Sequence, residues 1–102
     1  MSHKTDIKVL LVEDEAITAL AVNMALENLG YVTCQPAATG RQALDSLEQE
    51  KPDVVLMDIN LTGDLDGIET ARLMLQRSRP AIIFITGYSS EEVLEKPPPS
   101  TR

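Results

Sequence analysis

The segment DVVLMDI, residues 53–59, is a short run of mostly apolar residues, several of them β-branched. It ends with an aspartate followed by an isoleucine. Runs of this length and composition are typical of strands buried on both faces of a parallel sheet. KVLLV (8–12) and AIIFIT (81–86) have the same character, and YVTCQ (31–35) shows it more weakly. The sequence therefore predicts four strands.

Amphipathic helices are predicted between these strands. The first covers residues 15–29 and precedes Gly30, a residue type that commonly follows the end of a helix. The second covers residues 40–50 and the third residues 67–78. A capping pair marks the start of each of these two helices. These pairs are Thr39 with Gln42 and Asp66 with Glu69. The residues expected to face the core are Ile17, Leu20, Ala21 and Met24, then Ala43, Leu44 and Leu47, then Ile68, Ala71 and Leu75.

This alternation of strands and helices predicts an α/β fold with a doubly wound parallel sheet. Right-handed crossovers place helices on both faces of such a sheet, and ligands bind in a crevice beyond the carboxyl ends of its strands. The chain has 102 residues, 43% of them apolar, which suits one compact domain.

The composition excludes several classes of function. A net charge of -7 disfavours binding to nucleic acid or to an anionic membrane, because both require clustered basic residues. No apolar run has the length of a signal peptide or a membrane span, so we expect a cytoplasmic protein. Cys34 has no partner for an internal disulfide, as is usual in a reducing compartment. His3 is the only histidine, and its place in a polar segment excludes histidine-based metal sites and catalytic triads.

Three acidic residues stand at the ends of two predicted strands. Glu13 and Asp14 come directly after the first strand, and Asp58 lies at the end of the third. If these strands are neighbours in a parallel sheet, the three carboxylates converge on one crevice. Carboxylates at close range repel one another unless a cation neutralises them, and an oxygen site with few protein ligands suits Mg²⁺ or Mn²⁺. The sequence therefore predicts a divalent metal site.

The loop DINLTGDLDGIE, residues 58–69, also matches the ligand spacing of an EF-hand calcium loop. The positions that match are Asp58, Asn60, Thr62, Gly63, Asp66 and Glu69. An EF-hand needs a helix that enters its loop, whereas the entering segment here, KPDVVLM, contains a proline and β-branched residues. No second such loop occurs, so calcium binding is a remote alternative.

Four motifs resemble the receiver domain of bacterial two-component response regulators. VLLVEDE (9–15) is similar to the acidic-pair strand of that family, and VVLMDINL (54–61) to its phosphoacceptor strand. DGIETA (66–71) resembles the start of its third helix, and FITG (84–87) its hydroxyl-bearing fourth strand. The resemblance covers about residues 7–88. It implies a flavodoxin-like sheet with the strand order 2-1-3-4-5.

The resemblance also implies a role for each site residue. Asp58 takes a phosphoryl group from a sensor histidine kinase or a phosphotransfer protein, which makes the chain a signalling module rather than an enzyme. Asp14, Asp58 and the backbone carbonyl of Asn60 bind Mg²⁺ or Mn²⁺. Glu13 supports the metal's ligand shell, and Thr86 hydrogen-bonds the phosphoryl group.

The end of the chain departs from the family pattern. Receivers carry a lysine at the end of a fifth strand, and VLEKP (93–97) is similar to that ending, which would make Lys96 the phosphoryl-binding amine. However, Lys96 follows Thr86 by only ten positions, too few for an ordinary crossover helix and strand. In the alternative interpretation, Ser89 and Glu92 cap a fourth helix and Lys96 is a surface charge.

Two functions remain open for a receiver domain over residues 1–97 with a disordered tail over 98–102. One is a phosphorylation relay, which the acidic residues favour. The other is a degenerate receiver that acts by binding or dimerisation, which the shortened end favours. A metal-dependent phosphohydrolase is a distant third, because Asn60 stands where such enzymes usually carry a second acid. Without the last helices of the family, AIIFI would lie uncovered. A homodimer is therefore expected, formed either by packing of the bare faces against each other or by exchange of the segment after Thr86 between chains.

Overall fold

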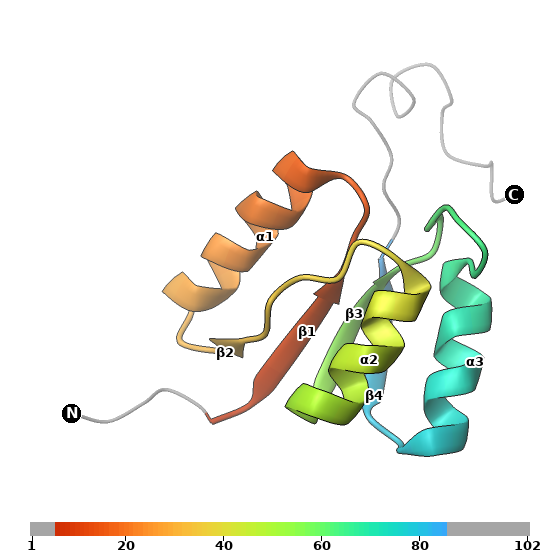
Figure 1. Ribbon diagram of the computed structural model, residues 1–102. Coiled ribbons are helices and arrows are strands. Elements are labelled where there is room, and N and C mark those ends of the chain that lie inside the picture. Colours follow the sequence, from red (N-terminus) through yellow and green to blue (C-terminus); the bar gives the residue numbers. More distant parts are fainter. Residues whose placement is uncertain (1–5, 86–102) are drawn as a thin grey trace, which may run out of the picture.

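The computed structural model describes residues 6–85, which form a four-stranded parallel sheet and three helices (Figure 1). The strands are β1 (Lys8–Val12), β2 (Val32–Thr33), β3 (Val54–Asp58) and β4 (Ala81–Ile85). The helices are α1 (Ala16–Asn28), α2 (Gly40–Glu50) and α3 (Gly67–Arg77). The strand order β2-β1-β3-β4 confirms the predicted doubly wound sheet. The expected fifth strand falls outside the described residues.

The helices are divided between the two faces of the sheet. α2 and α3 pack side by side, whereas α1 stands apart from them next to β1 and β2 (Figure 1). Right-handed crossovers require this division, because the chain steps along the sheet in one direction from β1 to β2 and in the other from β2 to β3 and β4. The register pairs Val12 with Met57 and Asp58 with Ile85, so the central strands end together.

The main core lies between the sheet and the pair formed by α2 and α3. Its buried members are Leu10, Val12, Cys34, Ala37, Ala43, Leu44, Leu47, Val55, Met57, Leu61 and Met74. All three residues predicted to face inward from α2 belong to this cluster, and Cys34 is buried as expected. Both predicted caps are present, since the side chains of Thr39 and Asp66 accept backbone N–H groups at the starts of α2 and α3.

Helix α1 packs through a different face from the predicted one. Ile17, Leu20 and Met24 are 77%, 62% and 53% exposed, whereas Ala19 is the buried residue of this helix. The prediction was wrong because apolar residues lie on nearly all sides of α1. Helical spacing alone then cannot select the face that packs against the sheet.

The inward face of α3 is also rotated from the prediction. Ala71 is buried as expected, but Ile68 and Leu75 are exposed, and Thr70 and Met74 are buried instead. The helix begins at Gly67 directly against the end of β3, and this contact fixes its rotation about its own axis. The apolar pattern of α3 carries no information about that contact.

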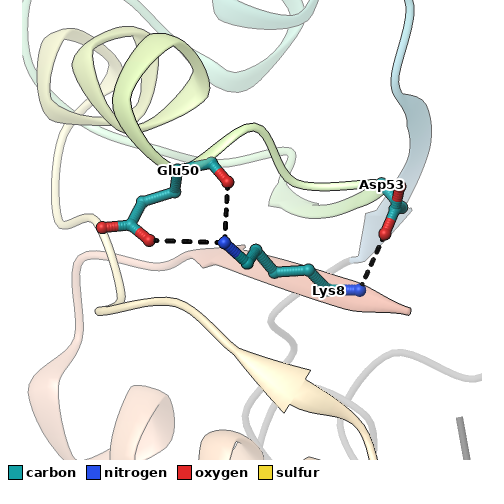
Figure 2. Close-up of polar contacts among 3 residues, drawn as sticks. All are labelled: Lys8, Glu50 and Asp53. Carbon is teal, nitrogen blue, oxygen red and sulfur yellow. Dashed lines mark hydrogen bonds and ion pairs between the residues drawn. The ribbon is translucent and has the colours of Figure 1, made fainter. Parts of the chain in front are cut away.

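Lys8 joins three segments at the amino end of β1 (Figure 2). Its backbone N–H donates to Asp53 Oδ2 at 2.9 Å, and its ammonium donates to the backbone oxygen of Glu50 at 2.9 Å. The ammonium also lies 3.7 Å from the Glu50 carboxylate. It therefore satisfies a carbonyl that the last turn of α2 leaves without an intrahelical partner. These contacts hold α2 and the start of β3 against β1.

Strand β4 exposes large apolar side chains. Ile83 is 52% and Phe84 43% exposed, in agreement with the expectation that AIIFI is not fully covered. Between residues 6 and 85, no helix has the length and apolar character needed to cross a membrane.

Candidate metal centre

Three carboxylates meet where β1 and β3 end. Glu13 and Asp14 follow β1 directly, and Asp58 is the last residue of β3. Each residue offers one oxygen, and these oxygens all lie within 4.8 Å of one another. The expected convergence is therefore observed, because β1 and β3 are hydrogen-bonded neighbours that end at the same edge of the sheet.

The electrostatics of this cluster favour a bound cation. Glu13 and Asp58 are buried, at 8% and 5% exposure, whereas Asp14 is exposed. Burial raises the pKa of the Glu13 carboxyl; a hydrogen bond from the Glu15 N–H opposes the rise, and the charges of Asp58 and Asp14 add to it. A divalent cation would offset the repulsion between the carboxylates, and hard oxygen donors are the ligands that Mg²⁺ prefers. The donor set therefore fits Mg²⁺.

Backbone donors fix the two buried carboxylates. The Glu15 N–H donates to Glu13 Oε2 at 3.1 Å, and the Asn60 N–H donates to Asp58 Oδ1 at 2.9 Å. Both bonds span two residues and form tight local turns at the ends of their strands. Each carboxylate is therefore held by the backbone of its own loop.

Asp14 is held by a residue of another loop. Its Oδ2 atom accepts a hydrogen bond from Thr62 Oγ1 at 2.7 Å, with the Thr62 N–H at 3.4 Å. From the sequence, Thr62 is expected only as a possible calcium ligand. No local pattern could reveal this contact, because the two residues are 48 positions apart and meet only through the pairing of β1 with β3.

Helix α3 begins in contact with the end of β3. A Cβ atom on Gly67 would overlap the backbone oxygen of Asp58 and stand 3.1 Å from the Cα of Ile59. Asp66 caps the same helix, because its Oδ1 accepts the Glu69 N–H at 2.8 Å. The pair Asp66–Gly67 therefore sets how closely α3 approaches Asp58, and only glycine permits this approach without a shift of the backbone.

The calcium-loop alternative does not agree with this geometry. Strand β3, not a helix, enters the loop at residues 58–69. Asp66 serves as a helix cap, and Glu69 lies 3.5 Å from Arg72 in an ion pair. Among the residues that the structure describes, the carboxylate group able to hold a metal is Glu13, Asp14 and Asp58, without Glu69.

Two predicted site residues, Thr86 and Lys96, lie outside the described part of the chain, as do Ser89, Glu92 and the tail at 98–102. Asn60 directly follows the loop residue Ile59, and its N–H donates to Asp58. Its predicted role, which uses the backbone carbonyl, stays a prediction.

Comparison with known proteins identifies the family. The sequence model of the response regulator receiver domain matches residues 9–97. Sporulation initiation phosphotransferase F of Bacillus subtilis is 34% identical over 90 residues, which cover 87% of this chain and 71% of that protein. The chain therefore belongs to the response regulator receiver family.

Solved structures and longer relatives agree with this assignment. The signal receiver domain of a modulated diguanylate cyclase from Desulfovibrio desulfuricans has a TM-score of 0.79 and 36% identity, over 87% of this chain and 71% of that one. The response regulator PhyR from Brucella abortus has a TM-score of 0.76 and 31% identity, over 84% of this chain and 35% of that one. The transcriptional regulatory protein PdtaR of Mycobacterium tuberculosis is 30% identical over 87% of this chain, which spans 43% of its length.

Family and site together define the class of function. Receiver domains are the phosphoacceptor modules of two-component signalling systems. The acidic cluster of Glu13, Asp14 and Asp58, in which Glu13 and Asp58 are buried, fits the Mg²⁺-dependent phosphorylation site of such a module.

Proposed function

We propose that Asp58 accepts a phosphoryl group from a sensor histidine kinase or a phosphotransfer protein, in a reaction that requires Mg²⁺ or Mn²⁺. The observation that carries this proposal is the position of Asp58. Its carboxylate is buried at the end of β3, within reach of Glu13 and Asp14, at the edge of the sheet where parallel α/β folds bind ligands. The test is phosphoryl incorporation, which an Asp58→Asn variant should lose.

The chemistry follows from the residues around Asp58. An Asp58 oxygen attacks the phosphorus of the donor, the bond from phosphorus to the leaving group breaks, and an acyl phosphate forms on the side chain. Asp14, Asp58 and the backbone carbonyl of Asn60 would hold Mg²⁺, with Glu13 supporting its water ligands. The metal supplies charge neutralisation for a carboxylate that approaches an anionic donor. The close approach of Gly67 to the backbone oxygen of Asp58 would help to hold the acceptor in place during the attack.

We place the Thr86 hydroxyl at the phosphoryl oxygens in the same proposal. The pairing of Asp58 with Ile85 supports this role for Thr86, because Ile85, the residue before Thr86 in the sequence, lies beside the acceptor at the end of β4. The Thr86 hydroxyl could donate a hydrogen bond to the new phosphoryl group. Movement of this side chain would convert the change in charge into a conformational change. Lys96 keeps both interpretations given above, the phosphoryl-binding amine and the surface charge.

The metal preference gives a direct prediction. We expect the protein to bind Mg²⁺ or Mn²⁺ weakly, and Asp14→Ala to weaken this binding by about tenfold or more. Glu69→Gln should leave it unchanged, since Glu69 pairs with Arg72 on α3. Titration followed by two-dimensional NMR measures both variants. Calcium binding tighter than about micromolar that depends on Glu69 would instead restore the calcium-loop interpretation.

Self-association is a second candidate function, which the exposed apolar side chains of α1 and β4 favour. Ile17, Leu20, Met24, Ile83 and Phe84 are each more than two-fifths exposed. Apolar surface of this extent on a small domain commonly marks an interface.

We therefore expect a homodimer at protein concentrations of roughly tens of micromolar, measured by light scattering coupled to size exclusion. Ile83→Lys and Leu20→Lys, which place a charge on β4 or on α1, should show which element forms the interface. Gln49, an exposed residue of α2 outside both elements, provides a lysine control. A monomer that binds no hydrophobic dye would rule out the homodimer.

A further inference from the structure

Asp14 differs from the other two acids in how it is held. Glu13 and Asp58 are buried and accept backbone donors from their own loops, whereas Asp14 is exposed. In the described part of the chain, both hydrogen bonds that reach the Asp14 carboxylate come from Thr62. The orientation of Asp14 therefore depends on the loop between β3 and α3.

The position of Thr62 in that loop is well determined. The residue before it, Leu61, is buried in the main core and donates its N–H to the Asp58 carbonyl oxygen at 3.3 Å. The residue after it, Gly63, has a φ of +107°, a conformation that glycine adopts readily and other residues avoid. Leu61 anchors the loop and Gly63 turns it. Thr62 lies between them and, although exposed, directs its hydroxyl toward Asp14 at the end of β1.

From this arrangement we infer that Thr62 is a positioning residue for metal binding at the acidic cluster, acting through Asp14. The inference rests on the proposed Mg²⁺ site. A carboxylate has two oxygens with about four lone-pair sites, so it can accept from Thr62 and still offer a lone pair to a cation. A hydroxyl is a neutral donor, which orients the carboxylate without a positive charge that would compete with the metal. The same bond ties the loop after Asp58 to the metal site.

The test compares Thr62→Val with Thr62→Ser by titrating the full chain with MgCl₂ and following the amide signals by NMR. Valine keeps the shape of threonine and removes the hydroxyl, whereas serine retains it. We expect the Mg²⁺ dissociation constant of Thr62→Val to rise about threefold to tenfold, as for the loss of one ordinary, solvent-exposed hydrogen bond. Thr62→Ser should stay within about twofold of the wild type. Thr62 is exposed, so metal-free thermal unfolding of both variants should match the wild type.

A second comparison separates this effect from a general change in the loop. In an Asp14→Asn background, Thr62→Val should cause no further loss of Mg²⁺ affinity, because the carboxylate that it orients is absent. Equal affinities of wild type and Thr62→Val, or an equal loss in Thr62→Val and Thr62→Ser, would overturn the inference while leaving the Mg²⁺ site intact. A wild-type chain that binds no Mg²⁺ would overturn the site and the inference together.

Discussion

Asp58→Asn should take up no phosphoryl group when it is incubated with acetyl phosphate and Mg²⁺, whereas the wild type should gain a single one. The two side chains have the same shape, so the fold and the turn to the Asn60 N–H can persist. The amide is a poor nucleophile and cannot form the acyl phosphate. Intact mass measured directly after incubation reports the incorporation.

A matched variant controls for the change from aspartate to asparagine. Asp64 lies in the loop that follows Asp58. It is exposed, forms an ion pair with Arg41 at 3.5 Å and is not part of the acidic cluster. Asp64→Asn should therefore incorporate the phosphoryl group as the wild type does. Undiminished labelling of Asp58→Asn would show that another side chain is the acceptor, and the assignment of Asp58 would be wrong.

Gly67→Ala should lower the free energy of unfolding by about 1–3 kcal/mol, as overpacking does at well-packed positions. In an open helix the same change would stabilise the protein by about 1 kcal/mol, because alanine is the better helix former. At Gly67 the same change should destabilise the protein instead, because the added methyl group would overlap the backbone oxygen of Asp58. Urea unfolding followed by circular dichroism measures the difference.

Gly63→Ala provides the comparison for Gly67→Ala. A Cβ atom on Gly63 would meet no other atom within 4 Å, but its φ of +107° strains any side chain. We expect a loss of about 1–2 kcal/mol from that strain, independent of packing. Gly67→Ala, in contrast, should also weaken Mg²⁺ binding, because α3 must move away from Asp58. A Gly67→Ala protein that is more stable than the wild type would contradict the close contact.

The sequence alone was sufficient to predict most of the secondary structure. Strands β1 and β3 and helix α2 lie close to their predicted ranges, and the caps at Thr39 and Asp66 were predicted correctly. These features depend on residues within a few positions of one another, so a local pattern contains the information. The convergence of the acids was predictable too, because parallel neighbouring strands end at one edge of the sheet.

Where local patterns were ambiguous, the prediction was wrong. The apolar residues of α1 offer two stripes with helical spacing, and the exposed one containing Ile17 was chosen over the one containing Ala19. In α3 the buried face follows the contact of Gly67 with β3 rather than the largest apolar side chains. Thr86 and Lys96 remain predictions from the family resemblance.

The sequence by itself determined the order of strands and helices, the helix caps and the set of acidic residues that form the site, because these follow from short-range periodicity and from strand direction. Only the tertiary structure decided which side chains hold that site together. Thr62 reaches Asp14 across 48 positions, and Gly67 packs against Asp58 at the end of β3. Such contacts form because the sheet brings loops that are distant in the sequence close together in space. A local sequence pattern does not specify the distance between two such loops.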